Sequence, residues 1–97
     1  MRIFRYQLAL VEQETRAAVE VAMPAGATVL HFDFQRDWPT LWALVDETSA
    51  LYVRTFEVYP TGGEVPEDNA GYFRRYVGTA LQGGFVWHCF ERIDRLT

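Results

Sequence analysis

Apolar and polar residues alternate along most of the chain with a period of two, which is typical of half-buried β-strands. From Arg2 to Leu10 the even positions are apolar from Phe4 onward. Val19–Met23 repeats the alternation until proline and glycine in Pro24-Ala25-Gly26 end it. The two segments predict an opening hairpin with a polar turn over Glu12–Thr15.

Val29–Gln35 has the clearest alternation of the chain. Its apolar residues share one predicted face and its polar residues the other, with Leu30, Phe32 and Phe34 opposite His31, Asp33 and Gln35. Leu41–Val45 is instead apolar on both faces, which predicts a central strand or one between packed layers. A short helix over the same residues is the alternative.

The second half of the chain predicts three further extended segments. Leu51–Tyr59 is β-branched and aromatic, and its mixed faces indicate a bulge or a sheet edge. Pro60–Asn69 concentrates proline, glycine and acidic residues, so we expect an exposed loop that is the best candidate for mobility. Tyr72–Leu81 is expected to begin with a helical turn and to become extended over Tyr76–Ala80. Gly83-Gly84 then reverses the chain into a strand over Phe85–Ile93.

Seven short strands at regular spacing predict an all-β fold, namely a compact antiparallel β-sandwich or small barrel with at most one short helix. The 97 residues fit a single domain, 1–97. A chain of this size hides only about 60–65% of its unfolded surface. Its seven Phe, five Tyr and three Trp are therefore expected to dominate the core. We also expect a homo-oligomer, with some of these rings at the interface.

The net charge and the cysteine content indicate which binding partners and which cellular compartment to expect for this protein. The formal net charge of −4 argues against a general polyanion binder, so duplex nucleic acid is not expected as a partner. The apolar stretches are short and the N-terminus lacks a signal-peptide core, so neither membrane insertion nor export is expected. Cys89 is the only cysteine, which precludes an intrachain disulfide and suits the cytoplasm.

The chain contains no lysine, since all nine cationic residues are arginine. Walker-type nucleotide hydrolysis, Schiff-base chemistry and pyridoxal catalysis all use a lysine amine and are therefore excluded. GC-rich coding is the simpler account of this bias, and selection for guanidinium chemistry is the alternative. We expect no cofactor.

The residues also argue against an enzyme. Ser49 is the only serine and lies in a polar connector, while Cys89 lies in an apolar run and is most simply a small core residue. His88 and Cys89 are adjacent on a predicted strand, so their side chains point to opposite faces and do not form a catalytic dyad. We expect no catalytic residue.

A metal site has a weaker basis than solvent-facing or hydrogen-bonded histidines. His31 and Asp33 share a strand face, and His88 would approach them only if the third and last strands were neighbours. Two histidines and scattered carboxylates arise easily by chance. We therefore predict no metal site.

The segment from Gly71 to Tyr76 is the sharpest functional candidate. Arg74 and Arg75 carry guanidinium groups that match phosphates, and Tyr72 and Tyr76 carry rings that stack on bases. The same residue types suit a protein interface, or simple packing with the arginines at the surface.

Among the tryptophans, Trp42 and Trp87 are expected in the core. Trp38 precedes Pro39 in a predicted turn and is the one expected to be exposed and available to a partner. With His88, Trp38 completes the set of candidate partner-binding residues.

Several segments resemble a domain-of-unknown-function family of small proteins from tailed phages and prophages. The similarity covers most of the chain, and its most distinctive parts are Leu41-Trp42-Ala43-Leu44-Val45-Asp46 and Gly83-Gly84-Phe85-Val86-Trp87-His88. The chain departs from the family pattern at Tyr59-Pro60-Thr61-Gly62-Gly63-Glu64, where relatives more often have a Gly-Thr-Gly-His-type loop. Any histidine-dependent role of that loop is therefore missing here.

The resemblance implies an origin in tailed phages or prophages, and it assigns no catalytic residue to this chain. Together with the residues above, it favours a non-enzymatic phage-type protein that binds a host protein or a nucleotide-type small ligand stoichiometrically, as an antagonist of host defence. A sponge for a cyclic or modified nucleotide is the second hypothesis, and a small virion or assembly component is the third. If the chain is phage-encoded, its compartment is the host cytoplasm.

Overall fold

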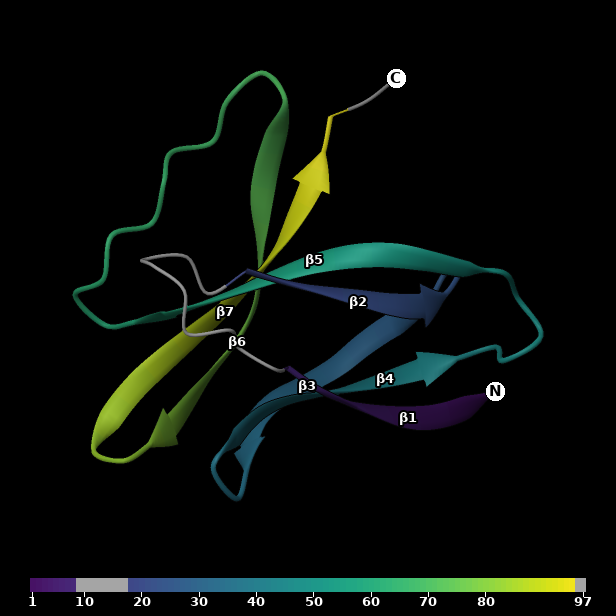
Figure 1. Cartoon of the computed structure of the whole chain (residues 1–97), viewed down its shortest axis with the longest axis horizontal. Coiled ribbons are helices and arrows are strands. Elements are labelled where there is room, and N and C mark those ends of the chain that lie inside the picture. Colours follow the sequence, from purple (N-terminus) through teal and green to yellow (C-terminus); the bar gives the residue numbers. More distant parts are fainter. Residues whose placement is uncertain (9–17, 96–97) are drawn as a thin grey trace.

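In the computed structural model, which describes residues 1–8 and 18–95, the chain forms seven β-strands and no helix within those ranges (Figure 1). The strands are β1 (Arg2–Gln7), β2 (Ala18–Pro24), β3 (Thr28–Gln35), β4 (Trp38–Val45), β5 (Leu51–Pro60), β6 (Tyr72–Gln82) and β7 (Phe85–Asp94). All strand pairs are antiparallel. The predicted all-β sandwich of about seven short strands is thereby confirmed. The described part of the chain contains no helix long and apolar enough to span a membrane.

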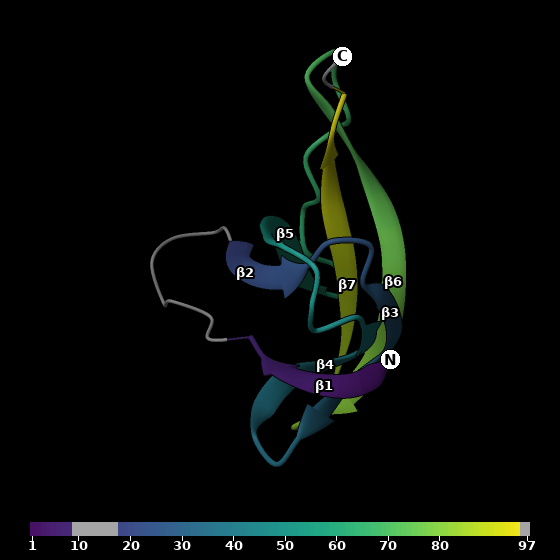
Figure 2. The same ribbon diagram turned by 90° about the vertical axis from the view of Figure 1, so that its right-hand side faces the viewer.

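The strands form two sheets that enclose the core between them. One sheet has three strands in the order β1-β4-β3, and the other has four in the order β2-β5-β7-β6. β3 also packs beside β6, so the two sheets meet along one side of the sandwich (Figure 2).

β4 occupies the centre of the three-stranded sheet, as its apolar residues predict. It pairs with β1 on one side and with β3 on the other, which rules out the helical alternative for this segment. Leu41, Ala43 and Val45 point into the core and are fully buried. Trp42 has the opposite parity, lies half-buried against His31 on the outer face, and is therefore not the core residue that was predicted.

The predicted opening hairpin is wrong. β1 pairs with β4 and β2 pairs with β5, so the first two strands belong to different sheets. The error arises because alternation identifies a strand without identifying its partner. Residues 9 and 10 of the predicted first strand, and the predicted turn over Glu12–Thr15, lie outside the described residues.

A bulge in β3 changes its predicted faces. The register against β4 shifts between Val29 and His31. The extra residue of a bulge is left out of the pairing, and Leu30, which lies at the shift, is exposed. Val29 then packs on the core from the same side as Phe32 and Phe34. The faces predicted from the alternation are therefore correct from His31 onward and wrong for Leu30.

Two further local predictions in the second half are wrong. β5 lies between β2 and β7 and is therefore not an edge strand, and no register shift interrupts its pairs. The polar residue Glu57 on this strand is buried, and an ion pair with Arg74 compensates its charge. Tyr72 begins a strand and not a helical turn, because it already pairs with Asp94. The hairpin at Gly83-Gly84 is confirmed, with both glycines at positive φ.

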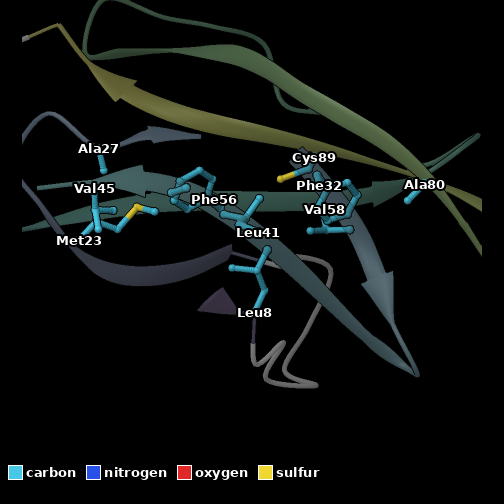
Figure 3. Close-up of a cluster of buried hydrophobic side chains, with 11 residues drawn as sticks. Leu8, Met23, Ala27, Phe32, Leu41, Val45, Phe56, Val58, Ala80 and Cys89 are labelled. Atoms are coloured by element: carbon cyan, nitrogen blue, oxygen red, sulfur yellow. The ribbon is translucent and has the colours of Figure 1, made fainter. Parts of the chain in front are cut away.

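The core consists of side chains from both sheets, drawn in Figure 3. Phe32 and Leu41 come from the three-stranded sheet, and Phe56, Val58 and Cys89 face them from the four-stranded one. Burying each large apolar side chain contributes about 1.5–3 kcal/mol. The predicted core role of Cys89 is confirmed. Trp87 packs against the edge of this cluster, as predicted.

The connection between β5 and β6 is exposed from Thr61 to Gly71, as predicted for this loop. Its end is fastened to the sheet by Asn69, whose side-chain oxygen accepts hydrogen bonds from the backbone of Gly71 and Tyr72. Its middle is fastened by Arg74, which donates to the carbonyl oxygen of Pro66 at 2.8 Å. The loop therefore lies against the face of the four-stranded sheet that carries Arg74.

Candidate functional site

The six candidate residues from the sequence are distributed over three places. The outer face of the four-stranded sheet carries four of them, Tyr72, Arg74, Tyr76 and His88. Arg75 is adjacent to Arg74 in β6 and points to the opposite face, beside β3. Trp38 begins β4 in the other sheet. The structure therefore does not bring all six residues together.

Arg74 is engaged in a buried ion pair with Glu57. Both side chains are only 5% exposed, and the guanidinium reaches across β7 to the carboxylate on β5. Its Cζ also lies 5.0 Å from the centre of the Tyr72 ring. The hydrogen bond that Arg74 donates to the Glu57 carboxylate raises the pKa of Arg74 further above its ordinary value. Arg74 thus joins two strands and the loop at Pro66.

His88 has a hydrogen-bond partner at both ring nitrogens. Nε2 lies 2.7 Å from Thr61 Oγ1 and Nδ1 lies 3.0 Å from Thr79 Oγ1, which in turn bonds to the Tyr76 hydroxyl. His31 and Asp33 pair on the other sheet at 3.6 Å. Within residues 1–8 and 18–95, no three His, Cys, Asp or Glu residues are grouped so that they can hold a metal ion.

Cys89 is fully buried in the core. Burial raises the pKa of its thiol to about 12, and the nearby carboxylates of Glu91 and Glu57 act in the same direction. The thiolate that nucleophilic chemistry requires is therefore scarce at neutral pH.

Arg75 shares the carboxylate of Glu91 with Arg54. Arg54 binds Glu91 in a bidentate manner at 2.7 and 2.9 Å, and Arg75 Nη2 donates to the same carboxylate at 3.0 Å. Burial acts to raise the pKa of Glu91, but the hydrogen bonds and positive charges of Arg54 and Arg75 outweigh it and lower the pKa. Two cations against one carboxylate leave this cluster with a positive charge.

The cluster lines a cleft of about 350 Å³ where β3 lies beside β6. Residues 27–29 form one wall, and Arg75, Tyr76 and Val77 form another. Arg54 anchors the floor, because its Nη1 donates to the carbonyl oxygen of Ala27 at 2.6 Å. At the mouth, the Arg75 side chain is 61% exposed, whereas the Tyr76 side chain points to the outer face, where its hydroxyl bonds to Thr79 Oγ1. We call this the seam cleft.

A second cleft, of about 490 Å³, surrounds Trp38. It is lined by Arg5, Gln7, Gln35, Arg36, Asp37 and Trp38. The indole is 49% exposed, as the sequence predicted for this tryptophan. Arg5 Nη1 donates to Gln35 Oε1 at 2.7 Å, which links β1 to β3 across β4. We call this the Trp38 cleft.

Sequence reasoning missed Arg54 and Glu91 in the first cleft, and Arg5 and Arg36 in the second. Arg54 and Glu91 are 37 residues apart in the chain and meet only because β5 pairs with β7. Arg5 reaches the second cleft only because β1 pairs with β4. The one available signal was a charged residue at a core-facing strand position, which applies to Glu91 between Cys89 and Ile93.

The chain matches the model of a family described as Domain of unknown function (DUF7352) over residues 1–96, and it therefore belongs to that family. No curated protein and no solved structure matches it. The expected membership of an uncharacterised domain family is confirmed.

Proposed function

We propose that this protein is a non-enzymatic binding domain that captures one protein partner stoichiometrically at the seam cleft. The observation that carries the proposal is the position of Arg75, which Glu91 holds at the mouth of the cleft with most of the side chain exposed. Arginine and tyrosine are the residue types that most often anchor protein interfaces. Arg75 supplies the arginine at this mouth.

The chemistry of the cleft favours an acidic side chain on the partner. A guanidinium has five N–H donors, and among the described residues Arg75 uses one of them, for Glu91. The remaining donors match a carboxylate in a bidentate geometry. The positive charge left by Arg54, Arg75 and Glu91 acts in the same direction.

Preorganisation supports a binding role for this site. Arg54 fixes Glu91 by two hydrogen bonds and is itself fixed by Ala27, so Arg75 is oriented before a partner arrives. Less side-chain freedom then remains to be lost on association. The exposed Leu30, next to Val29 of the cleft wall, adds apolar surface for the same partner.

The resemblance to small proteins of tailed phages and prophages extends the proposal. In that setting the partner is a host protein in the host cytoplasm, and its capture antagonises host defence. Stoichiometric binding requires no turnover, which agrees with a thiol that burial keeps protonated. We also propose a homo-oligomer, whose mass in solution is measured in the same experiment.

Affinity purification from a lysate of the source organism tests the proposal. The wild-type chain should recover one partner at near-equal stoichiometry, with the masses of the free chain and the complex measured by light scattering. Arg75→Gln should abolish recovery.

Arg2→Gln is the matched control, because Arg2 is also exposed and pairs with a single carboxylate, that of Glu47. It should leave recovery unchanged. Failure to recover any stoichiometric partner, or equal recovery by the Arg75→Gln variant, would show that the seam cleft is not the binding site.

A further inference from the structure

We infer that the Trp38 cleft is a second binding site, and that it takes a nucleotide: a planar base stacked on Trp38 with its phosphate held by Arg5 and Arg36. The cleft of about 490 Å³ falls within the range of about 300–1,000 Å³ that is typical of small-molecule sites. None of its residues belongs to the seam cleft.

Trp38 supplies the stacking surface. Its indole is 49% exposed at the start of β4, opposite Gln35 of β3. Because Trp38 lines the cleft and is half exposed, its ring is accessible to a bound base. Aromatic side chains are the usual stacking platforms for bases in proteins that bind single-stranded nucleic acid.

Arg5 and Arg36 supply the charge. Arg5 is exposed on β1 and is oriented by its 2.7 Å hydrogen bond to Gln35. Arg36 is exposed in the turn between β3 and β4. The one carboxylate of the lining, that of Asp37, accepts a hydrogen bond from Gln82 Nε2 at 3.0 Å. Two guanidinium groups and one engaged carboxylate leave the cleft suited to a phosphate.

The backbone of Arg36 gives independent support. Its φ of 58° is the only positive value at a non-glycine residue in the described part of the chain. The two-residue turn from Gln35 to Trp38 would normally place glycine, asparagine or aspartate there. A bulky residue held in the left-handed region is unfavourable, and residues strained in this way cluster at active sites, ligand clamps and switch regions. The turn thus places a guanidinium at the cleft in spite of backbone strain.

Gln7 and Gln35 complete the recognition chemistry. Each side-chain amide carries both donors and an acceptor, which match the hydrogen-bonding edges of a base. Both residues are exposed and line the cleft. A site built from one ring, two guanidinium groups and two amides recognises a base and its phosphate together.

The Trp38 cleft is spatially separate from the seam cleft. β6 contacts the Trp38 cleft at Gln82, through Asp37, whereas it contributes Arg75 to the seam cleft. From Arg75 to Gln82 an extended strand covers roughly 23 Å at about 3.3 Å per residue. An experiment that rules out binding at one cleft therefore does not contradict binding at the other.

Titration calorimetry of the full chain against adenosine, guanosine, cytidine and uridine monophosphate, cyclic adenosine monophosphate and inorganic phosphate tests the inference. At least one nucleotide should bind with one-to-one stoichiometry per chain, and inorganic phosphate should bind more weakly. Trp38→Ala should weaken nucleotide binding about tenfold or more. Tyr52→Ala, which removes an exposed ring from the other sheet, should leave it unchanged.

Arg36→Gly keeps the experiment decisive if other variants fold poorly, because glycine adopts the φ of this position without strain. It should weaken nucleotide binding while the thermal midpoint of unfolding stays equal or rises. Three results would overturn the inference: no nucleotide binds at millimolar concentration, Trp38→Ala and Arg36→Gly bind as tightly as the wild type, or inorganic phosphate binds as tightly as the nucleotides.

Discussion

Arg74 and Glu57 form an ion pair in which neither side chain is more than 5% exposed, and this pair connects the two strands that flank β7. The pair also reaches the loop, because Arg74 donates to the carbonyl oxygen of Pro66. The buried guanidinium explains how a charged residue of β5 is accommodated on a sheet face that a loop covers. It also means that Arg74 and Arg75 act on opposite faces of β6 and do not converge on one ligand.

Removing one partner of this pair should destabilise the fold strongly. Arg74→Met leaves the Glu57 carboxylate buried without its cation, which costs about 3–5 kcal/mol. The free energy of unfolding from urea denaturation measures the loss. Arg2→Met removes an exposed pair with Glu47 and should change stability by only about 0–1 kcal/mol. A similarly small effect of Arg74→Met would mean that the pair does not hold these elements together.

Stability should fall with acid in a way that depends on Glu91. Arg54 and Arg75 lower the pKa of Glu91 in the folded state despite its burial. Glu91 therefore contributes stability that is complete above its ordinary pKa of 4.5 and is lost as the pH falls through the lowered folded value.

The variant Glu91→Gln isolates this contribution. It should be less stable than the wild type at pH 7, and the difference should shrink steadily below pH ~4.5. Urea denaturation across the acid range measures both curves. A difference that stays constant with pH would contradict the shift assigned to Glu91.

Cys89 should be chemically silent in the folded protein. Its thiol lies in the core and its pKa is raised to about 12, so thiolate reagents at pH 8 should label it only after unfolding. The change in absorbance as a disulfide reagent reacts with the thiol, followed with and without urea, measures the labelling. Rapid labelling of the native chain would show that the core opens around this residue far more often than its burial indicates.

The strands were predictable from the sequence because their periodicity is a local property. Leu41–Val45 was expected in the centre of a sheet since both of its faces are apolar, and β4 lies there. Strand pairing was not predictable, because the partners of β1 and β2 are determined by long-range packing. A bulge such as that at Leu30 also leaves no periodic signal, since it adds one residue to an otherwise regular strand.

The candidate sites were also predictable only in part, because the exposure of a residue follows from the local sequence whereas its side-chain partners depend on strand pairing. The exposure of Trp38 followed from its place beside a turn. The partners of Arg75 did not, because Glu91 and Arg54 reach it only through the pairing of β5, β7 and β6. Tyr72 begins a strand because its backbone pairs with Asp94, which the local sequence does not encode.

Gly78 should not tolerate a side chain without cost. A Cβ at this position would lie 3.2 Å from Cβ of Phe32, at the point where β6 packs on β3. Phe32 is held in the core and has little room to move, so Gly78→Ala should destabilise the fold by about 1–3 kcal/mol. Thermal unfolding followed by circular dichroism measures this effect. An unchanged midpoint would show that the two sheets separate easily along this side.

Substitutions at Arg36 and Gly26 should change the stability in opposite directions, because both positions have a positive φ but only one of them is occupied by glycine. Arg36 has a φ of 58° and Gly26 a φ of 76°, and for both positions glycine is the residue that avoids strain. Arg36→Gly should therefore stabilise the fold by about 1 kcal/mol, and Gly26→Ala, where open space surrounds the new Cβ, should destabilise it by a similar amount. Urea denaturation of both variants gives the two signs directly. Loss of stability in Arg36→Gly would mean that the guanidinium supports the turn itself, and its presence there would then need no ligand to explain it.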